Sequence, residues 1–387
     1  MSSNLEQVIA RTFLDIADGL ETGSFGSRPR IAVTGLGSEH GEEEVFSAAL
    51  AASRKGVDVT YIGTMEDPSV HTVQAETEEQ AHQMMESLLA EKQVDGVVTM
   101  HYPFPIGVST VGRLVTPGRG RELFLATTTG TSSTDRVEGM IKNAVYGIIA
   151  AKACGIKRPT VGILNVDGAR QTETALKQLQ AGGYEIDFAE SARSDGGCVM
   201  RGNDLLAASC DVMVTDSLTG NILMKTLSAF TTGGSYESAG YGYGPGIGEG
   251  YDRLVLIVSR ASGAPVIANA IQFGAQLVQN GYRAVADAEF GAAKRAGLDQ
   301  ILQSRRAAKE AGAAQTQTIS APPKEVVTQA FTGIDVMDLE DAVQHLWKAG
   351  IYAESGMGCT GPMVMVNEAN GEKAAQLLKE GGWLSSL

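Results

Sequence analysis

The chain has 387 residues, of which 43% are hydrophobic, 20% are charged and 6% are aromatic; this composition is typical of a globular protein and excludes a disordered or fibrous chain. With 31 basic and 45 acidic residues, the net charge is −14, which argues against a nucleic-acid partner, because binding to phosphates requires clustered lysine and arginine. The first residues are too charged for a signal peptide and no apolar run approaches the ~20 residues of a membrane span, so we expect a soluble, cytoplasmic protein without a membrane partner.

Strands and helices alternate along the first part of the chain. We expect a helix over residues 1–20, followed by strands at 30–33, 57–62, 95–100 and 123–126 and by helices at 42–55, 76–92 and 135–154. Such alternation predicts a parallel sheet with helices on both faces. Residues 1–157 are therefore predicted to form a first α/β domain.

The same alternation begins again after Pro159. It predicts a second α/β domain over residues 158–263, with strands at 160–165, 184–189, 211–215 and 254–258 and helices at 172–181, near Leu205 and at 220–230. Residues 233–250 are rich in glycine and tyrosine, which favours either a mobile flap over a ligand or a flexible connection. Helices within residues 264–315 are expected to complete the first domain.

A polar segment that ends in two prolines, residues 313–324, is predicted to be a linker. Residues 316–387 are predicted to form a small C-terminal α/β module, with helices at 338–349 and 372–379, a loop at 354–362 and a strand at 363–366. The predicted fold class is α/β, with two open, mostly parallel sheets, flanking helices and this module.

The hydroxyl-rich segment 127–133 follows a predicted strand and precedes a predicted helix. Free N–H groups and the helix dipole at such a position favour an anion, to which hydroxyl groups add further donors. The candidate residues are Thr129, Gly130, Thr131 and Ser132. A helix N-cap is the alternative role for one hydroxyl of this segment.

A second candidate segment lies at the carboxyl end of a predicted buried strand, where open α/β sheets bind ligands. It contains Asp216 and Asn221, which would face a crevice at this edge of the sheet, and Lys225, one helical turn beyond Asn221. The alternative roles are a helix cap for Asp216 and a solvated charge for Lys225.

Cys359 lies among three glycines and a proline in residues 355–362, without the periodic apolar neighbours of a structural cysteine. A glycine-rich turn that includes Gly358, Thr360 and Gly361 can direct several N–H groups at one point, which would lower the pKa of a thiol and stabilise an oxyanion. The four cysteines and five histidines show no metal-binding spacing, so no metal is expected.

Three stretches resemble the phosphate acyltransferase of phospholipid synthesis: residues 31–37, residues 126–130 leading to Pro159, and residues 216–226. The chain departs from that family at Ser217 and Leu218, where the family has Gly and Phe, and at Ser259-Arg260, where it has His-Gly. As a whole, and in the segment Gly-Met-Gly-Cys-Thr-Gly at residues 356–361, the chain more closely resembles the family of alpha subunits of component C of glycine reductase.

This second resemblance implies that Cys359 carries an acetyl group and that inorganic phosphate releases it as acetyl phosphate, with no other cofactor. It also implies a ketoacyl synthase-like beta subunit as partner, selenoprotein A as an indirect partner in the cleavage of glycine, sarcosine or betaine, and a homo- or hetero-oligomer. We assign the small anionic substrate to residues Thr129, Gly130, Thr131, Ser132, Asp216, Asn221, Lys225 and Arg260. Two alternatives stay open: direct acyl transfer from coenzyme A or an acyl carrier to phosphate, and a non-catalytic scaffold subunit.

Overall fold

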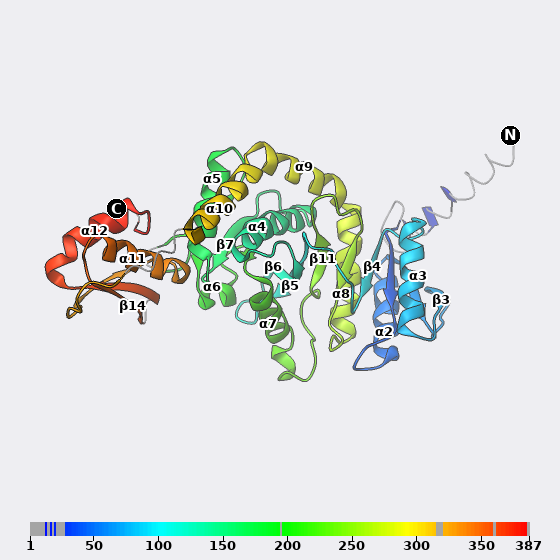
Figure 1. Cartoon of the computed structure of the whole chain (residues 1–387). Coiled ribbons are helices and arrows are strands. Elements are labelled where there is room, and N and C mark those ends of the chain that lie inside the picture. The colour runs from blue at the N-terminus through cyan, green and yellow to red at the C-terminus, as the bar shows by residue number, and fades with distance from the viewer. Residues whose placement is uncertain are drawn as a thin grey trace.

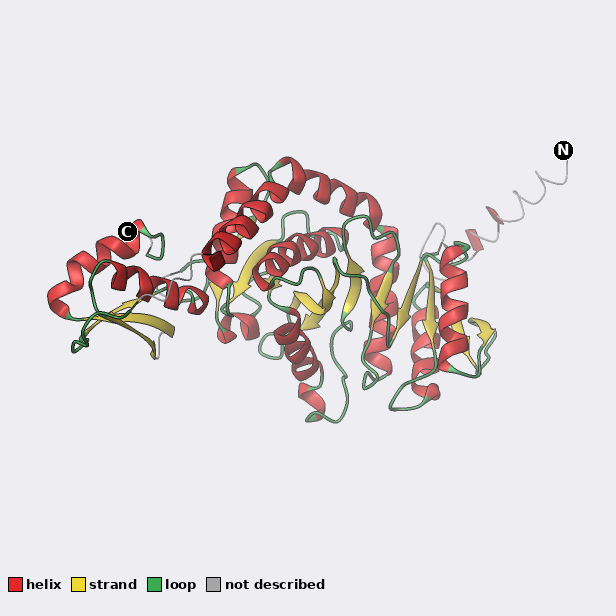
Figure 2. Cartoon of the chain, in the orientation of Figure 1, coloured by secondary structure: helices red, strands yellow, loops and turns green. Residues whose placement is uncertain are grey.

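The computed structural model describes residues 12–13, 16–17, 19–20, 28–193, 196–314, 320–358 and 361–384. In this part of the chain a large mixed sheet is flanked by helices, and a small sheet lies with two helices near the C-terminus (Figure 1 and Figure 2). The predicted α/β fold class is confirmed. The helix expected over residues 1–20 lies mostly outside the described residues.

The first half of the large sheet is parallel throughout, with the strand order β3-β2-β1-β4-β12. Along β1, Ile31 and Val33 belong to one core cluster and Ala32 to another, because successive side chains of a strand point to opposite faces. Helices therefore cover both faces of this half. Its elements are β1 (Arg30–Thr34), β2 (Asp58–Gly63), β3 (His71–Gln74), β4 (Gly96–Thr99), β12 (Val255–Ile257), α2 (Glu42–Ser53), α3 (Glu78–Ala90) and α8 (Ala264–Gln279).

The second half has the order β5-β6-β10-β7-β8, and β9 also pairs with β7. Its central helix, α4 (Arg136–Ala153), packs against β6 and β10 on the sheet and against neighbouring helices, which explains why most of its residues are buried. The strands are β5 (Val108–Val115), β6 (Glu122–Thr131), β7 (Thr160–Leu164), β8 (Asp187–Phe188), β9 (Val199–Met200) and β10 (Val212–Val214). The other helices are α5 (Ala169–Ala181), α6 (Gly202–Ala207), α7 (Ser217–Ser228), η1 (Phe230–Thr232), α9 (Tyr282–Arg295) and α10 (Leu298–Ala314).

A single strand, β11 (Gly244–Ile247), joins the two halves into one continuous sheet. It pairs antiparallel with β12 on one side and with β5 on the other. The sequence predicts a flap or a flexible connection over residues 233–250, and for these four residues that prediction is wrong, because all four are buried in the sheet. Gly244 has a φ of +82°, and a Cβ there would lie 1.8 Å from the carbonyl oxygen of Val111, so the strand needs glycine to approach β5 this closely.

The hydroxyl-rich segment forms a strand over most of its length, not the predicted loop. β6 continues through Thr131 and pairs antiparallel with β5, so that Gly130 is opposite Ser109. The threonine hydroxyls take part in this pairing: the Oγ1 atoms of Thr110 and Thr128 lie 2.7 Å apart, in the buried interior. Satisfied hydroxyls of this kind make a threonine run compatible with the centre of a sheet.

The C-terminal module contains a three-stranded antiparallel sheet with the order β13-β15-β14. The sequence predicts a loop at residues 354–362, but 353–358 and 361–366 form the two arms of a hairpin in which Gly358 is opposite Gly361. The residues between the arms, Cys359 and Thr360, lie outside the described residues. The elements of the module are β13 (Gln329–Thr332), η2 (Val336–Asp338), α11 (Leu339–Lys348), β14 (Ala353–Gly358), β15 (Gly361–Val366), η3 (Glu368–Asn370) and α12 (Gly371–Glu380).

The module lies at one end of the molecule, beside α5 and α10 (Figure 1). Two hydrogen bonds link η2 and its preceding residue to the start of α5: Gly168 N–H donates to Asp335 Oδ1 over 3.3 Å, and Gln171 Nε2 donates to Asp338 Oδ1 over 2.5 Å. None of the helices in the described residues is both long enough and apolar enough to span a membrane.

Candidate functional site

A cavity of about 210 Å³ opens at the carboxyl ends of β6 and β10, where α4 and α7 begin. This is the edge at which open α/β sheets bind ligands. The cavity brings together four of the predicted site residues from two distant parts of the chain: Gly130, Thr131, Ser132 and Asp216. It is also lined by Thr127, Ser133, Thr134, Arg136, Gly139, Asn143, Ser217 and Leu218.

Both helices begin at an aspartate that caps them. Asp135 Oδ1 accepts from Glu138 N–H over 2.9 Å, and Asp216 Oδ1 accepts from Leu218 and Thr219 N–H groups over 3.1 and 3.0 Å. Asp216 therefore has both roles that the sequence suggests, since it caps α7 and also lines the cavity. Its carboxylate occupies part of the positive end of α7, so an anion in the cavity must draw on other donors.

Arg136 is the cation that lines the cavity, and it is not among the site residues predicted from the sequence. It stands at the first position of α4, and its guanidinium lies 3.2 Å from Asp167 Oδ2, with 45% of the side chain exposed. An exposed arginine beside a helix N-terminus retains free N–H groups for a phosphate oxygen. The sequence could have indicated Arg136, because this residue directly follows Asp135, the aspartate that caps α4.

Asn143 holds the floor of the cavity in place. Its Oδ1 lies 3.1 Å from Ser109 Oγ and 2.8 Å from Ser132 Oγ, and its Nδ2 donates to the carbonyl of Thr215 over 3.1 Å. Asn143 is 2% exposed and lies within α4. One buried amide therefore fixes the strand ends of β6 and β10 relative to each other. The same contact engages the hydroxyl of Ser132.

Thr129 and Asn221 lie next to the cavity without lining it. The N–H of Thr129 donates to Thr110 Oγ1 over 3.0 Å, which uses one of the donors assigned to an anion. Asn221 Nδ2 donates to the carbonyl of Thr128 over 3.0 Å and so holds α7 against β6.

Lys225 and Arg260 form a separate group at the carboxyl end of β12. Lys225 Nζ lies 3.3 Å from Ser259 Oγ and 3.7 Å from the buried carboxylate of Glu237. Arg260 donates to the carbonyl of Gly37 and makes two hydrogen bonds to Glu78, which lower the pKa of that carboxyl group. The structure thus divides the predicted anion-binding residues into the β6–β10 cavity and this second group.

Cys359 and Thr360 lie outside the described residues, so the site described above does not include them. Their neighbours Gly358 and Gly361 end β14 and begin β15. These strands belong to the C-terminal module, which Figure 1 shows apart from α7 and β6.

The other three cysteines are poor nucleophiles. Burial raises the pKa of Cys154, Cys198 and Cys210 to about 12 in each case. At neutral pH such thiols stay protonated, whereas nucleophilic attack requires the thiolate. Within the described ranges, no three His, Cys, Asp or Glu side chains come together as a metal site would require.

Comparison with known proteins finds a matching family model and several similar proteins. A family model described as "Fatty acid synthesis protein" matches residues 29–365. The chain is 59% identical over 383 residues to the glycine/sarcosine/betaine reductase complex component C subunit alpha of Peptoclostridium acidaminophilum, covering 98% of this chain and 99% of that protein. It is 25% identical over 250 residues to the phosphate acyltransferase of Crocosphaera subtropica, covering 53% of this chain and 70% of that protein. A branched-chain phosphotransacylase structure from Enterococcus faecalis aligns with a TM-score of 0.45 and 17% identity, over 64% of this chain and 99% of that one.

Proposed function

The chain belongs to the family described as fatty acid synthesis protein, together with the alpha subunit of component C of the glycine/sarcosine/betaine reductase complex. From this premise we propose that it transfers an acetyl group from a thioester on Cys359 to inorganic phosphate. The 59% identity over 98% of the chain carries the proposal. The similarity to phosphate acyltransferases extends over only about half of the chain. The similarity to phosphate acyltransferases favours acyl chemistry with phosphate.

The proposed step exchanges one bond for another at the acetyl carbonyl carbon. An oxygen of hydrogen phosphate attacks this carbon, the tetrahedral oxyanion collapses, and the C–S bond breaks. The products are acetyl phosphate and the Cys359 thiolate, and the phosphate proton passes to the thiolate or to water. Since phosphate is already anionic at neutral pH, the step requires positioning and oxyanion stabilisation more than a strong base. Gly358, Thr360 and Gly361 are proposed as the loop that stabilises the oxyanion.

For the phosphate, the β6–β10 cavity is supported by three features. It lies at the carboxyl ends of parallel strands, it is bordered by the starts of two helices, and Arg136 supplies a cation. Thr131 and the backbone of Gly130 and Ser132 add polar groups from the neighbouring strand end. Lys225 and Arg260 remain candidates for a second part of the same substrate path.

The proposed partner is the beta subunit of component C, a ketoacyl synthase-like protein that would pass on the two-carbon unit received from selenoprotein A. The relative's name places that protein in a multi-subunit reductase complex.

The test is to trap the acyl enzyme. The full chain is exposed briefly to an acetyl thioester without phosphate, digested, and analysed by peptide mass spectrometry. We expect a 42-Da acetyl increment on the thiol of the peptide that holds Cys359, because a covalent intermediate accumulates when its acceptor is withheld. Addition of phosphate should remove this increment as acetyl phosphate appears. The variant Cys359→Ala should abolish both signals, whereas Cys210→Ala is the matched control and should abolish neither.

Direct acyl transfer from coenzyme A to phosphate is the second candidate, favoured by the similarity to phosphate acyltransferases. In that case Cys359→Ala would still form acetyl phosphate from acetyl coenzyme A, and no acetylated peptide would be trapped. This outcome would sink the Cys359 mechanism while leaving the chain a phosphate acyltransferase.

A further inference from the structure

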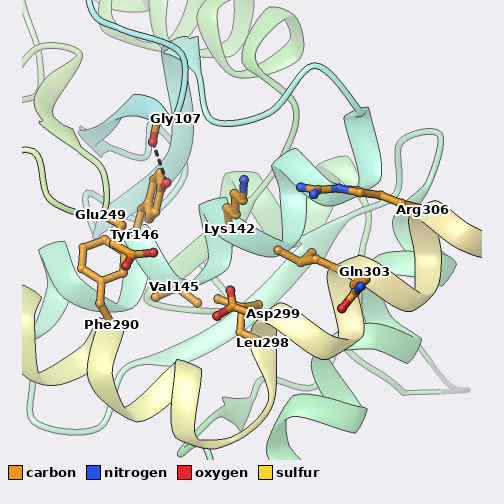
Figure 3. A pocket seen from close by; sticks show the side chains of 11 residues that line it. Gly107, Lys142, Val145, Tyr146, Glu249, Phe290, Leu298, Asp299, Gln303 and Arg306 are labelled. Atoms are coloured by element: carbon orange, nitrogen blue, oxygen red, sulfur yellow. Dashed lines mark hydrogen bonds between the residues drawn. The ribbon is translucent and has the colours of Figure 1, made fainter.

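A second cavity, of about 440 Å³, borders a different face of α4 from the one that borders the β6–β10 cavity. It lies between α4, the helices α9 and α10, and the loops that contain Gly107 and Glu249 (Figure 3). A space of this size belongs to the range in which proteins bind small organic ligands. It exceeds what inorganic phosphate or an acetyl group would fill.

One wall of this cavity is apolar and partly aromatic. Val145, Tyr146, Leu298 and Leu302 are buried, and the rings of Tyr146 and Phe290 meet edge to face at 5.7 Å. The hydroxyl of Tyr146 donates to the carbonyl of Gly107 over 2.7 Å, so the polar end of this side chain is already satisfied. The apolar side chains and aromatic rings of this wall suit a flat, weakly polar ring.

Two cations share one carboxylate at another side of the cavity. Lys142 Nζ lies 2.8 Å from Glu138 Oε1, and the guanidinium of Arg306 makes two hydrogen bonds to the same carboxylate, at 2.5 and 2.8 Å. Figure 3 shows the charged ends of Lys142 and Arg306 on one side of the cavity. Each cation keeps further N–H donors, so this side presents one positive charge more than Glu138 neutralises.

Acidic groups border the cavity away from these cations. Glu249 lies beside the rings of Tyr146 and Phe290 and is paired with Lys294. Asp299 stands in the first turn of α10, close enough to Lys294 for their charges to interact. A carboxylate at the edge of a nucleotide site is a common partner for the hydroxyl groups of a ribose.

We infer that this cavity binds an adenosine phosphate, with the phosphate group at Lys142 and Arg306, the base against Tyr146 and Phe290, and the ribose hydroxyls toward Asp299. A fatty acyl chain would offer nothing to the further N–H donors of Lys142 and Arg306, and a simple anion would leave the apolar wall in contact with water. The adenosine phosphate has two sources, a free nucleotide or the nucleotide end of coenzyme A. The inference does not depend on acetyl transfer at Cys359.

The test is isothermal titration of the full chain, without an acetyl donor, with ADP, coenzyme A, pantetheine and inorganic phosphate in turn. We expect ADP to bind, and the variant Arg306→Gln to weaken that binding about tenfold, the effect of losing one charge-assisted contact. Lys309→Gln is the matched control, because Lys309 lies on the same helix and pairs with Asp135 but does not line the cavity; it should change ADP binding less than about twofold. Phe290→Leu, which keeps the apolar volume but removes the ring, should also weaken ADP binding and leaves Glu138 and its partners unchanged.

The relative affinities for ADP and coenzyme A decide which of the two sources supplies the adenosine phosphate. Tighter binding of coenzyme A than of ADP, lost in Arg306→Gln, assigns the site to the coenzyme, and the reverse order assigns it to a free nucleotide. The inference is overturned if neither compound binds, if inorganic phosphate binds as tightly as ADP, or if Arg306→Gln and Phe290→Leu both leave binding unchanged.

Discussion

Asn143 shows how much of the candidate site depends on one buried side chain. Its amide reaches Ser109 on β5, Ser132 after β6 and the backbone of Thr215 after β10. The sequence gives little indication of this role, because an asparagine within an apolar helix segment has no local pattern that names its distant partners. Its contribution becomes visible only when the strand ends are brought together.

Asn143→Ala removes all three contacts and leaves two hydroxyls and one carbonyl group buried without that partner. We expect the free energy of unfolding to fall by about 2–3 kcal/mol, since each lost buried hydrogen bond costs about 1 kcal/mol, and the KM for phosphate to rise because Ser132 is no longer fixed. Urea unfolding and initial rates of acetyl phosphate formation measure the two effects. Asn143→Asp keeps the acceptor but sets a carboxylate against the carbonyl oxygen of Thr215 at a buried position, and should be at least as destabilising as Asn143→Ala. A KM for phosphate unchanged in both variants would remove Asn143 from the site.

Lys225 tests whether the second group takes part in phosphate binding. Its ammonium lies near Ser259 and Glu237, outside the β6–β10 cavity, but 56% of the side chain is exposed and accessible to an anion. We expect Lys225→Met to raise the KM for phosphate about tenfold, as loss of one charge-assisted contact would. Lys177→Met, which removes a cation paired with Glu173 on α5, is the control and should leave the KM as it is. If Lys225→Met behaves like the control, phosphate is bound without the second group.

Most individual strands and helices could be predicted from the sequence because the apolar runs and the helical periodicity are local signals. The strands that were not predicted are β3, β5, β9, β11, β13 and β14. Two of them join or border the halves of the sheet and have weak local signals: β5 mixes apolar residues with serine, threonine and arginine, and β11 consists of glycine, proline and isoleucine. Thr127 to Thr131 has the composition of a loop but forms a strand that pairs with β5, where the hydroxyls of Thr127 and Thr128 bond to Thr110 and to the carbonyl of Tyr243. These are tertiary effects, which no local pattern contains.

The candidate site was partly predictable for a related reason. Strand ends that precede helices mark the edge of the sheet where ligands bind. Thr131, Ser132 and Asp216 follow or end such strands, so the sequence could place all three at the same site, where the cavity contains them. The sequence cannot show that Lys225 and Arg260 are held by Ser259 and Glu78 in a separate group, because that depends on the path of α7 and on the join between the halves.

The contact between α7 and β6 depends on Gly220. A Cβ at this position would lie 1.7 Å from the carbonyl oxygen of Thr127, in the backbone of the facing strand. We expect Gly220→Ala to lower the free energy of unfolding by about 2 kcal/mol or more, because the helix must move away from the sheet. Gly139→Ala is the matched control in α4, since its Cβ would meet Ser132 Oγ at an ordinary 3.4 Å; it should be neutral or stabilising. Urea denaturation compares them, and equal stability of the two variants would contradict this account.

The contact between α4 and α10 should depend on pH. The hydrogen bonds from Arg306, and those from Lys142, lower the pKa of Glu138 to about 2. A lowered pKa means that the folded protein favours the charged carboxylate, so this stabilisation is complete above the ordinary pKa of about 4.3 and is lost as the pH falls toward 2. We expect Glu138→Gln to be less stable than the wild type by about 1–2 kcal/mol at pH 7. The difference should narrow below pH 4.3 in urea denaturation measured at several pH values. A difference that stays constant from pH 7 to pH 3 would contradict the assignment.

At the scale of the molecule, the C-terminal module and the β6–β10 cavity lie apart. Figure 1 places β14 at one end of the molecule and α7 near its middle. If Cys359 is the acetyl carrier, transfer to phosphate in the cavity requires either movement of the module or a cavity supplied by a second copy of the chain.

Mixing two variants with complementary defects, assayed at a phosphate concentration too low for either alone, distinguishes these routes, and this prediction rests on the proposed function. We expect Cys359→Ala mixed with the double variant Arg136→Gln/Lys225→Met to recover about a quarter of the wild-type activity, the share of functional pairings in randomly mixed dimers. Each variant incubated with itself is the control. If the mixture stays inactive although mass measurement shows mixed oligomers, each thiol serves the cavity of its own chain and the module must move.

The place of β11 has a consequence for how the protein melts. Because this strand is hydrogen-bonded along both edges, the loss of either half would leave it unpaired on one side. The two halves of the large sheet should therefore give a single calorimetric transition, despite a size at which chains commonly melt in separate steps. The C-terminal module has its own core and should give a separate peak.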